Sequence, residues 1–345
     1  MTPPRRAATA GRGRGRGASR RTLSRPVGTL TMKRGAGRST LRGGTWRCAL
    51  TETRTEWAEA EADAALTARR DQLLETLRGY GRVAVAFSGG VDSAVVAQAA
   101  FTALGDAVVA VTAVSDSLAQ GELEEAEALA RRIGITHRVI RTEEFADPNY
   151  LRNNPDRCYF CKSELYGRLA GLLGTLGVDT IASGANADDA GDHRPGMRAA
   201  AENGVRHPLQ ECGLDKAAVR ALAKAWGLPT WDKPATPCLS SRIAYGEEVT
   251  PERVRMIDQA EQWLRQATGL RVLRVRYHKG DLARVEVPAD DLPRLFAPDV
   301  RGPMVAAFRD LGFKFVTVDL EGFRSGSLNT LIPIEILQRP RAVKA

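Results

Sequence analysis

The sequence predicts an α/β protein, with a doubly wound parallel sheet followed by a smaller C-terminal α+β domain. Short apolar runs alternate with helix-like segments between residues 55 and 245, which is typical of a sheet covered by helices on both faces. The run at 107–114 consists of β-branched and small residues, as expected of a parallel strand buried on both sides. After Gly246 the alternation gives way to one long helix followed by strands, which indicates a second domain at 246–335.

The elements of the first domain follow from periodicity and from residues that start or stop them. Leucines at helical spacing predict a helix at 55–77, and Gly79 ends it. The helix expected at 121–133 has acidic residues early and arginines late, which suits the helix dipole. Further strands are expected at 83–87, 138–141 and 180–183, and further helices at 94–104, 163–176 and 215–226.

The second domain begins with a helix that runs to about residue 268. Thr250 is its expected cap, and Pro251 occupies the first helical position, where proline is favoured. Strands are expected at 272–277, 282–287 and 315–320, and a shorter helix at 303–311.

The positive charge belongs to the N-terminal tail. The chain carries a net charge of +9, but residues 1–50 contain 12 Arg, 1 Lys and no acidic residue, so the remainder is slightly acidic. The glycine- and arginine-rich repeat at 11–17 cannot bury a core, and disorder is predicted for residues 1–54. Three interpretations stay open: an anion- or RNA-binding arm, an organellar transit peptide, or sequence upstream of a true start such as Met32. Residues 336–345 form a second tail.

Charge and hydropathy narrow the class of protein. An acidic body does not favour nucleic-acid binding by the folded part. No apolar run reaches 18 residues and no secretory signal is evident, so neither a membrane span nor secretion is expected. The five cysteines are odd in number and include one tight pair, which does not indicate a disulfide framework. A reducing cytoplasm is therefore expected.

The most informative motif is SGGVDS at 88–93, which lies between an apolar strand and a helix start. Two glycines let the backbone approach an anion closely, and a helix N-terminus offers unpaired N–H groups. The acidic residue suits such a site if it holds Mg²⁺ that itself binds phosphate. The stretch resembles the PP-loop of ATP pyrophosphatases, although an ordinary strand-to-helix turn is the alternative. The expected ATP-binding residues here are Ser88, Gly89, Gly90, Asp92 and Ser93, with Asp92 as the magnesium contact.

A second polar segment follows the strand expected at 180–183. In GANADD, Asn and Asp side chains are able to contact adenosine or Mg²⁺, and the expected residues are Gly184, Asn186, Asp188 and Asp189. The chain has no P-loop lysine motif, which excludes a P-loop kinase or GTPase, and no dinucleotide fingerprint, so a dinucleotide-binding fold is not favoured.

Three cysteines carry the second chemistry. Cys158 and Cys161 form a Cys-x-x-Cys pair, which suits a metal, an iron–sulfur cluster or a redox disulfide. Cys238 ends a proline-rich and therefore stiff loop that continues into Ser241 and Arg242. Three cysteines could bind three irons of a [4Fe–4S] cluster and leave the fourth iron open for sulfide, whereas a plain interdomain linker is the alternative for the loop.

Alternating arginines mark the first strand of the second domain. Arg274 and Arg276 are two residues apart in a predicted strand, so both side chains point to one face. Paired guanidinium groups suit a phosphate. A solvated face of an edge strand is the alternative.

Taken together and in order, the motifs SGGVDS, NPDRCYFCK, GANADDAGDHRPG, WDKPATPCLSSRI, RVRYH and DLEGFRSGSLN resemble the LarE family of PP-loop sulfurtransferases from about residue 73 to residue 329. The resemblance implies a HUP-like PP-loop domain at 55–245 and a substrate and oligomerisation domain at 246–335, within a homo-oligomer such as a hexamer. It also implies that ATP adenylylates carboxylates of pyridinium-3,5-biscarboxylic acid mononucleotide. Sulfur then displaces AMP to give thiocarboxylates for a nickel-pincer cofactor used by lactate racemase.

Two sulfur sources occur in that family. The residue matching Cys238 either gives up its own sulfur, or joins Cys158 and Cys161 in a [4Fe–4S] cluster that relays sulfide. Because all three cysteines are present, the cluster type is preferred, and the source of the sulfide stays open. The resemblance implies that Arg274 and Arg276 hold the substrate phosphate and that Ser241 and Arg242 lie near the sulfur centre. A tRNA thiolase, an amidating synthetase and an ATP-binding sensor are the alternative functions.

Overall fold

The structure is a computed structural model that describes residues 64–191, 195–324 and 326–328. All of these residues belong to one compact unit, Arg54–Ala345. The predictions for residues 1–54 and 336–345, and the start of the first predicted helix, fall outside the described residues. Within the described ranges, no helix combines the length and the apolar character that a membrane span requires.

A four-stranded parallel sheet forms the N-terminal part of this unit, which confirms the predicted α/β fold. Its strands are β1 (Val83–Ala86), β2 (Val108–Val114), β3 (Thr136–Arg141) and β4 (Thr180–Ala182), in the order β3-β2-β1-β4. The chain steps outward from β1 to β3 and then returns to the other side of β1. The change of direction between β1 and β4 creates a crevice at the carboxyl ends of these strands, where ligands of such sheets bind.

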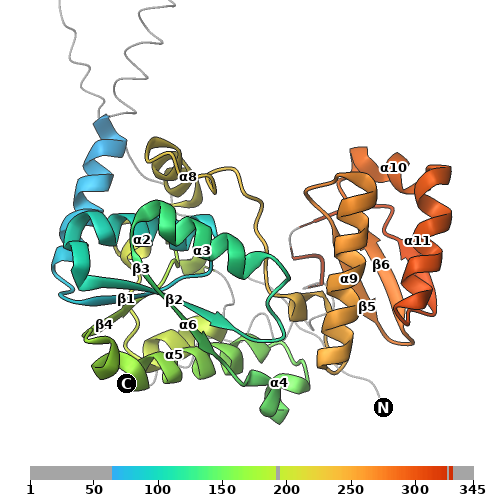
Figure 1. Ribbon diagram of the computed structural model, residues 1–345, viewed down its shortest axis with the longest axis horizontal. Helices are drawn as coiled ribbons and strands as arrows, with labels where there is room; N and C mark the ends of the chain where they lie inside the picture. The colour runs from blue at the N-terminus through green and yellow to red at the C-terminus, as the bar shows by residue number, and fades with distance from the viewer. Residues whose placement is uncertain (1–63, 192–194, 325, 329–345) are drawn as a thin grey trace, which may run out of the picture. The chain divides into compact units, whose positions relative to one another are not determined.

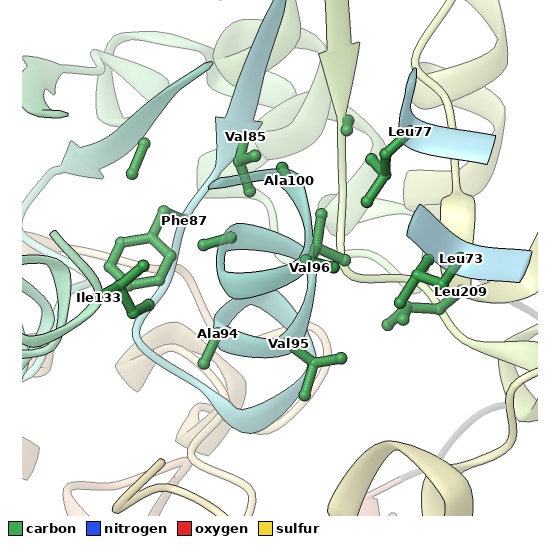
Figure 2. Packing of buried hydrophobic residues seen from close by; sticks show 14 of the residues in the cluster. Leu73, Leu77, Val85, Phe87, Ala94, Val95, Val96, Ala100, Ile133 and Leu209 are labelled. Atoms are coloured by element: carbon green, nitrogen blue, oxygen red, sulfur yellow. The ribbon is translucent and has the colours of Figure 1, made fainter. Parts of the chain in front are cut away.

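Helices cover both faces of this sheet (Figure 1). One face packs against residues 64–78, α2 (Val91–Leu104), α3 (Glu122–Ile133) and α8 (Lys216–Ala225), and the other against α5 (Arg157–Leu176) and α6 (Pro195–Glu202). Because β-strand side chains alternate, Val83 and Val85 enter the first core and Ala84 enters the second. Figure 2 shows the first core, in which Val85 and Phe87 lie close to the buried side of α2.

Two helices begin earlier than the sequence predicts. Helix α2 begins at Val91 rather than at 94, and α5 begins at Arg157 rather than at 163. Cys158 and Cys161 therefore lie on the first turns of α5. Both starts differ from the prediction because polar residues, Asp92 and Ser93 in α2 and Arg157 and Cys158 in α5, interrupt the apolar periodicity from which a helix is predicted.

A smaller C-terminal sheet of three strands, packed with helices, follows the first sheet, as predicted. Antiparallel β5 (Arg274–His278) and β6 (Leu282–Glu286) pair, and β7 (Phe315–Val318) joins β6 in parallel. Helix α9 (Pro251–Thr268) and helix α11 (Pro298–Asp310) pack on it, and Pro303 lies inside α11 instead of opening it. The remaining short elements are α4 (Pro148–Leu151), α7 (Pro208–Glu211), α10 (Leu292–Phe296) and 3₁₀ turns at Gly105–Ala107, Glu144–Ala146, Ala187–Gly191, Leu239–Arg242 and Ala289–Asp291.

Candidate functional site

The loop after β1 presents backbone N–H groups at the start of α2. Gly89 adopts φ of +71°, a conformation that favours glycine, and Gly90 caps α2 without a side-chain hydrogen bond. The buried Ser93 hydroxyl donates to the Gly90 carbonyl over 3.1 Å and accepts from the Ser88 N–H over 3.2 Å. Ser93 thus fixes the loop from inside, and the first-turn N–H groups of α2 stay available to an anion.

Asp92 faces a lysine that the sequence analysis missed. Its carboxylate accepts hydrogen bonds from Lys216 Nζ over 2.5 Å and from Asn186 Nδ2 over 3.1 Å. Lys216 opens α8, so the fold brings it to the loop from 124 residues away. Mg²⁺ is usually bound through one or two carboxylates plus waters and substrate phosphates, so a single Asp92 carboxylate fits that role.

The segment after β4 supports the loop after β1 through hydrogen bonds. The Asn186 N–H donates to Asp189 Oδ2 over 2.9 Å, and its side chain donates to Asp92. Asp188 Oδ2 accepts from the Lys216 backbone N–H over 3.0 Å, at the start of α8. These hydrogen bonds therefore connect β4, the loop after β1 and the start of α8 at the carboxyl ends of the strands.

Gly184 is required for a close backbone approach. A Cβ atom at this position would lie 2.7 Å from the Ser93 nitrogen and 3.0 Å from the Asp92 carbonyl carbon. We expect Gly184→Ala to lower the free energy of unfolding by about 1–3 kcal/mol because the two backbone segments must move apart. We also expect weaker ATP binding, since the displaced atoms begin α2. Denaturant unfolding and nucleotide titration measure the two effects.

Gly174→Ala is the matched control, because a Cβ there, within α5, meets no atom within 4 Å. Removing a helical glycine should stabilise the protein by about 0.5–1 kcal/mol and leave ATP binding unchanged. If Gly184→Ala behaved like Gly174→Ala, the close approach would not matter for the site.

One cavity of about 450 Å³ connects the phosphate loop with the cysteine loop. Ser88, Gly90 and Asp92 line it at the loop after β1, and Cys161 and Cys238 line it from α5 and from the proline-rich loop. Three lysines, at 162, 216 and 233, also line this cavity. Isolated lysines leave no local signal in a sequence, and only the fold brings these three together.

Two charged groups shape the walls of this cavity. Lys233 Nζ pairs with Glu122 over 2.9 Å and with Glu125 over 2.7 Å, which attaches the start of the proline-rich loop to α3. Glu144 is buried, and one of its oxygens accepts hydrogen bonds from Ser115 over 2.5 Å and Ser117 over 3.3 Å. The sequence analysis singled out neither residue.

The three candidate cluster ligands share one region but do not form a metal site as they lie here. Cys161 and Cys238 line the same cavity, while Cys158, one helical turn from Cys161, is exposed and does not line it. Within the described ranges, no three or more His, Cys, Asp or Glu side chains are grouped closely enough to hold a metal ion. Burial raises the pKa of the Cys161 thiol to about 12, so this thiol is protonated when no metal is bound. The three thiols are therefore not grouped as cluster ligands in this structure, and the cluster stays a prediction.

Arg242 is a buried support for the cysteine loop. Its side chain is fully buried, and Nη1 donates to the carbonyl of Cys238 over 3.1 Å and also to that of Pro237. Nε donates to Glu261 Oε1 over 3.0 Å, which forms a buried ion pair. Arg242 lines neither this cavity nor its neighbour, so it holds the backbone around Cys238 without reaching into the site.

A second, smaller cavity of about 160 Å³ contains the two arginines of β5. Arg274 and Arg276 line it together with Ser241 and with Arg157, which the sequence analysis did not single out. Ala235 and Pro237 line both cavities, so the proline-rich loop is the wall between them.

Neither arginine of β5 belongs to a solvated strand face, because both are buried. Arg276 binds Glu286 on β6 over 2.8 Å. Arg274 donates to the carbonyls of Leu273 over 2.7 Å and Ala235 over 2.5 Å. Burial, together with the positive charge of Arg242, lowers the pKa of Arg274 to about 10.

Fold and site together define an ATP-binding α/β domain of the PP-loop type. The NAD synthase family matches residues 68–153. An uncharacterized protein of Synechocystis is 47% identical over 75% of this chain and 97% of its own length. The pyridinium-3,5-bisthiocarboxylic acid mononucleotide synthase of Lactiplantibacillus plantarum is 36% identical over 77% of this chain and 95% of its own length. The chain belongs to the LarE family, that of this synthase, and is an ATP-dependent enzyme.

A more distant similarity bears on the alternative of a tRNA thiolase. The tRNA-specific 2-thiouridylase MnmA of Caulobacter vibrioides is 30% identical, but over 44% of this chain and 50% of its own length. The similarity to the synthase thus extends over far more of this chain than the similarity to the thiouridylase.

Proposed function

We propose that this enzyme inserts sulfur into carboxylates of pyridinium-3,5-biscarboxylic acid mononucleotide and so forms the bisthiocarboxylic acid mononucleotide after which its Lactiplantibacillus relative is named. The observation that carries the proposal is the shared cavity, in which the phosphate loop and Cys238 face the same space. Activation by ATP and attack by sulfur can therefore occur on one bound molecule.

Activation begins when a substrate carboxylate oxygen attacks the α-phosphorus of ATP and pyrophosphate leaves. The N–H groups at the start of α2, with Lys216, would stabilise the charge that develops on the departing pyrophosphate. Mg²⁺ held by Asp92 and the phosphates would neutralise further charge. The product is an acyl-adenylate, whose AMP is a far better leaving group than the oxygen of a free carboxylate.

Sulfur transfer follows at Cys238. The Cys238 thiolate attacks the acyl carbon, the bond to AMP breaks, and a thioester to the protein forms. Loss of the Cys238 Cα proton and cleavage of its Cβ–S bond would then release the thiocarboxylate and leave dehydroalanine. Arg242 acts as a positioning residue in this scheme, because it fixes the carbonyl of Cys238. Ser241 lies next to Arg242 and lines the neighbouring cavity.

A cluster-borne sulfide is the other source of sulfur that we keep as a proposal. It would require Cys158, Cys161 and Cys238 to come together as ligands, which the described geometry does not show. In either case we expect the enzyme to work in the cytoplasm as a homo-oligomer, with the substrate phosphate bound beside Arg274 and Arg276.

The test is to incubate enzyme, ATP, Mg²⁺ and the pyridinium substrate anaerobically and to measure pyrophosphate, product mass, iron content and protein mass. Pyrophosphate release with formation of a thiocarboxylate supports the proposed function. Loss of the mass of H₂S from Cys238 in iron-free protein identifies the sacrificial route, whereas iron that is lost on Cys158→Ala identifies the cluster. Absence of both pyrophosphate and thiocarboxylate would refute the proposal, and thiolation of tRNA instead would favour the thiolase alternative.

A further inference from the structure

The second cavity holds two buried arginines without an acidic partner. Arg242 is paired with Glu261, and Arg276 is paired with Glu286. Arg157 and Arg274 are only 4% and 5% exposed, yet neither forms an ion pair with any residue in the described part of the chain. Buried cations without a counter-charge are costly, so this cavity is built for an anion that the ligand must supply.

In Arg157, one terminal guanidinium nitrogen is held by hydrogen bonds and the other is available to a ligand. Its Nη1 donates to Asn153 Oδ1 over 2.6 Å and to the Ser240 carbonyl over 2.7 Å. The nearest acceptor described for Nη2 is the sulfur of Cys158 at 4.0 Å, which is too long for a strong hydrogen bond. The guanidinium is therefore held in place by Nη1 and able to bind a ligand in the cavity that it lines through Nη2.

Arg274, on β5, is likewise held in place and lines the same cavity as Arg157. Two of its nitrogens are held by backbone carbonyls, and its guanidinium lies over the Phe323 ring at 5.2 Å. Neutral carbonyls and a ring orient the group. Glu261 is the carboxylate whose charge acts on Arg274, but it is already paired with Arg242 and Arg265. Arg276 differs, because Glu286 neutralises its charge. Its Nη1 and Nη2 also donate to the Ser241 carbonyl and to the Ser327 hydroxyl.

We infer that Arg157 and Arg274 supply the positive charge of this anion site and that Arg276 mainly orders it. The inference rests on the proposed function, in which the anion is the phosphate of a pyridine mononucleotide. Arg157 also binds the carbonyl of Ser240, two residues after Cys238, so the group that binds phosphate and the loop that carries the sulfur share one guanidinium. Phosphate binding and the placement of Cys238 are thereby coupled.

The test compares the binding affinities of two probes, nicotinic acid mononucleotide and nicotinic acid riboside, which differ only in the phosphate. By titration calorimetry we expect the wild-type protein to prefer the mononucleotide by about tenfold or more, since charge-assisted bidentate contacts are strong. Arg157→Gln and Arg274→Gln should each reduce this preference to about twofold or less. ATP binding is measured in parallel and should not change.

The matched control is Arg168→Gln, which removes an arginine from the same helix. Arg168 is paired with Glu143 and Glu164 and lines neither cavity, so the phosphate preference should persist. If Arg157→Gln fails to fold, as loss of ATP binding would reveal, Arg157→Lys decides the question. Lysine keeps the charge but lacks the planar fork, and we expect the preference to fall about threefold or more.

Each outcome has a definite meaning. A preference that is present in the wild type and lost in the Arg157 variant supports the inference. A wild-type preference that survives in a folded Arg157 variant overturns the inference and leaves the proposed function intact. A wild-type protein that does not distinguish the two probes rejects the proposed substrate class, and the inference with it.

Discussion

Cys238→Ala should separate the two halves of the reaction. We expect pyrophosphate release on the first turnover to stay within about threefold of wild type, because the phosphate loop and Lys216 are unchanged. Thiocarboxylate formation should fall by about a thousandfold or more, because no other side chain can replace an essential nucleophile. Single-turnover measurements of pyrophosphate and product mass check both values.

Cys212→Ala is the control for Cys238→Ala. Cys212 is buried in the first core, where its sulfur contacts the Thr76 hydroxyl over 3.3 Å, and it does not line either cavity. Its replacement should leave both half-reactions intact. Normal thiocarboxylate yield from Cys238→Ala would show that sulfur does not pass through this residue.

Glu261→Ala should strongly destabilise the protein. Glu261 is fully buried, pairs with Arg242 and accepts a hydrogen bond from the Val275 N–H over 3.1 Å. Removing one partner leaves the buried Arg242 charge uncompensated, which costs about 3–5 kcal/mol. Equilibrium unfolding in denaturant measures the loss. We also expect slower sulfur transfer in the folded fraction, because Arg242 holds the Cys238 loop.

The control on the same helix is Glu252→Ala. Glu252 is exposed and forms a surface pair with Arg255 over 3.0 Å, so its removal should change stability by about 0.5 kcal/mol or less. Similar effects of the two substitutions would contradict a special role for the buried pair.

The sequence was sufficient for the fold class because periodicity reports burial. The run predicted at 107–114 forms the buried strand β2 from Val108 to Val114, and the parallel sheet and the smaller C-terminal sheet are both present as predicted. The start of α5 was missed because Arg157 and Cys158 carry polar chemistry instead of an apolar stripe.

The site could be predicted only where residues cluster in the sequence. SGGVDS and the cysteine motifs are local patterns, and the structure places Asp92, Cys161 and Cys238 on one cavity. Lys216 and Glu144 are single residues whose role depends on which strand and helix they follow, so no local pattern marks them. The ion pairs of Arg242 with Glu261 and of Arg276 with Glu286 could likewise not be predicted from the sequence, because the partners lie on different elements.

The wall made by Ala235 and Pro237 separates the two cavities and bears on the length of substrate that the enzyme accepts. On the proposed function, a substrate whose phosphate is bound in the smaller cavity has to extend past this wall for its carboxylate to reach ATP and Cys238. The stiff proline-rich loop fixes that span, since proline restricts backbone motion. On the proposed function, the wall acts as a molecular ruler: shorter phosphorylated acids would bind without being activated, and ATP would be protected from wasteful use.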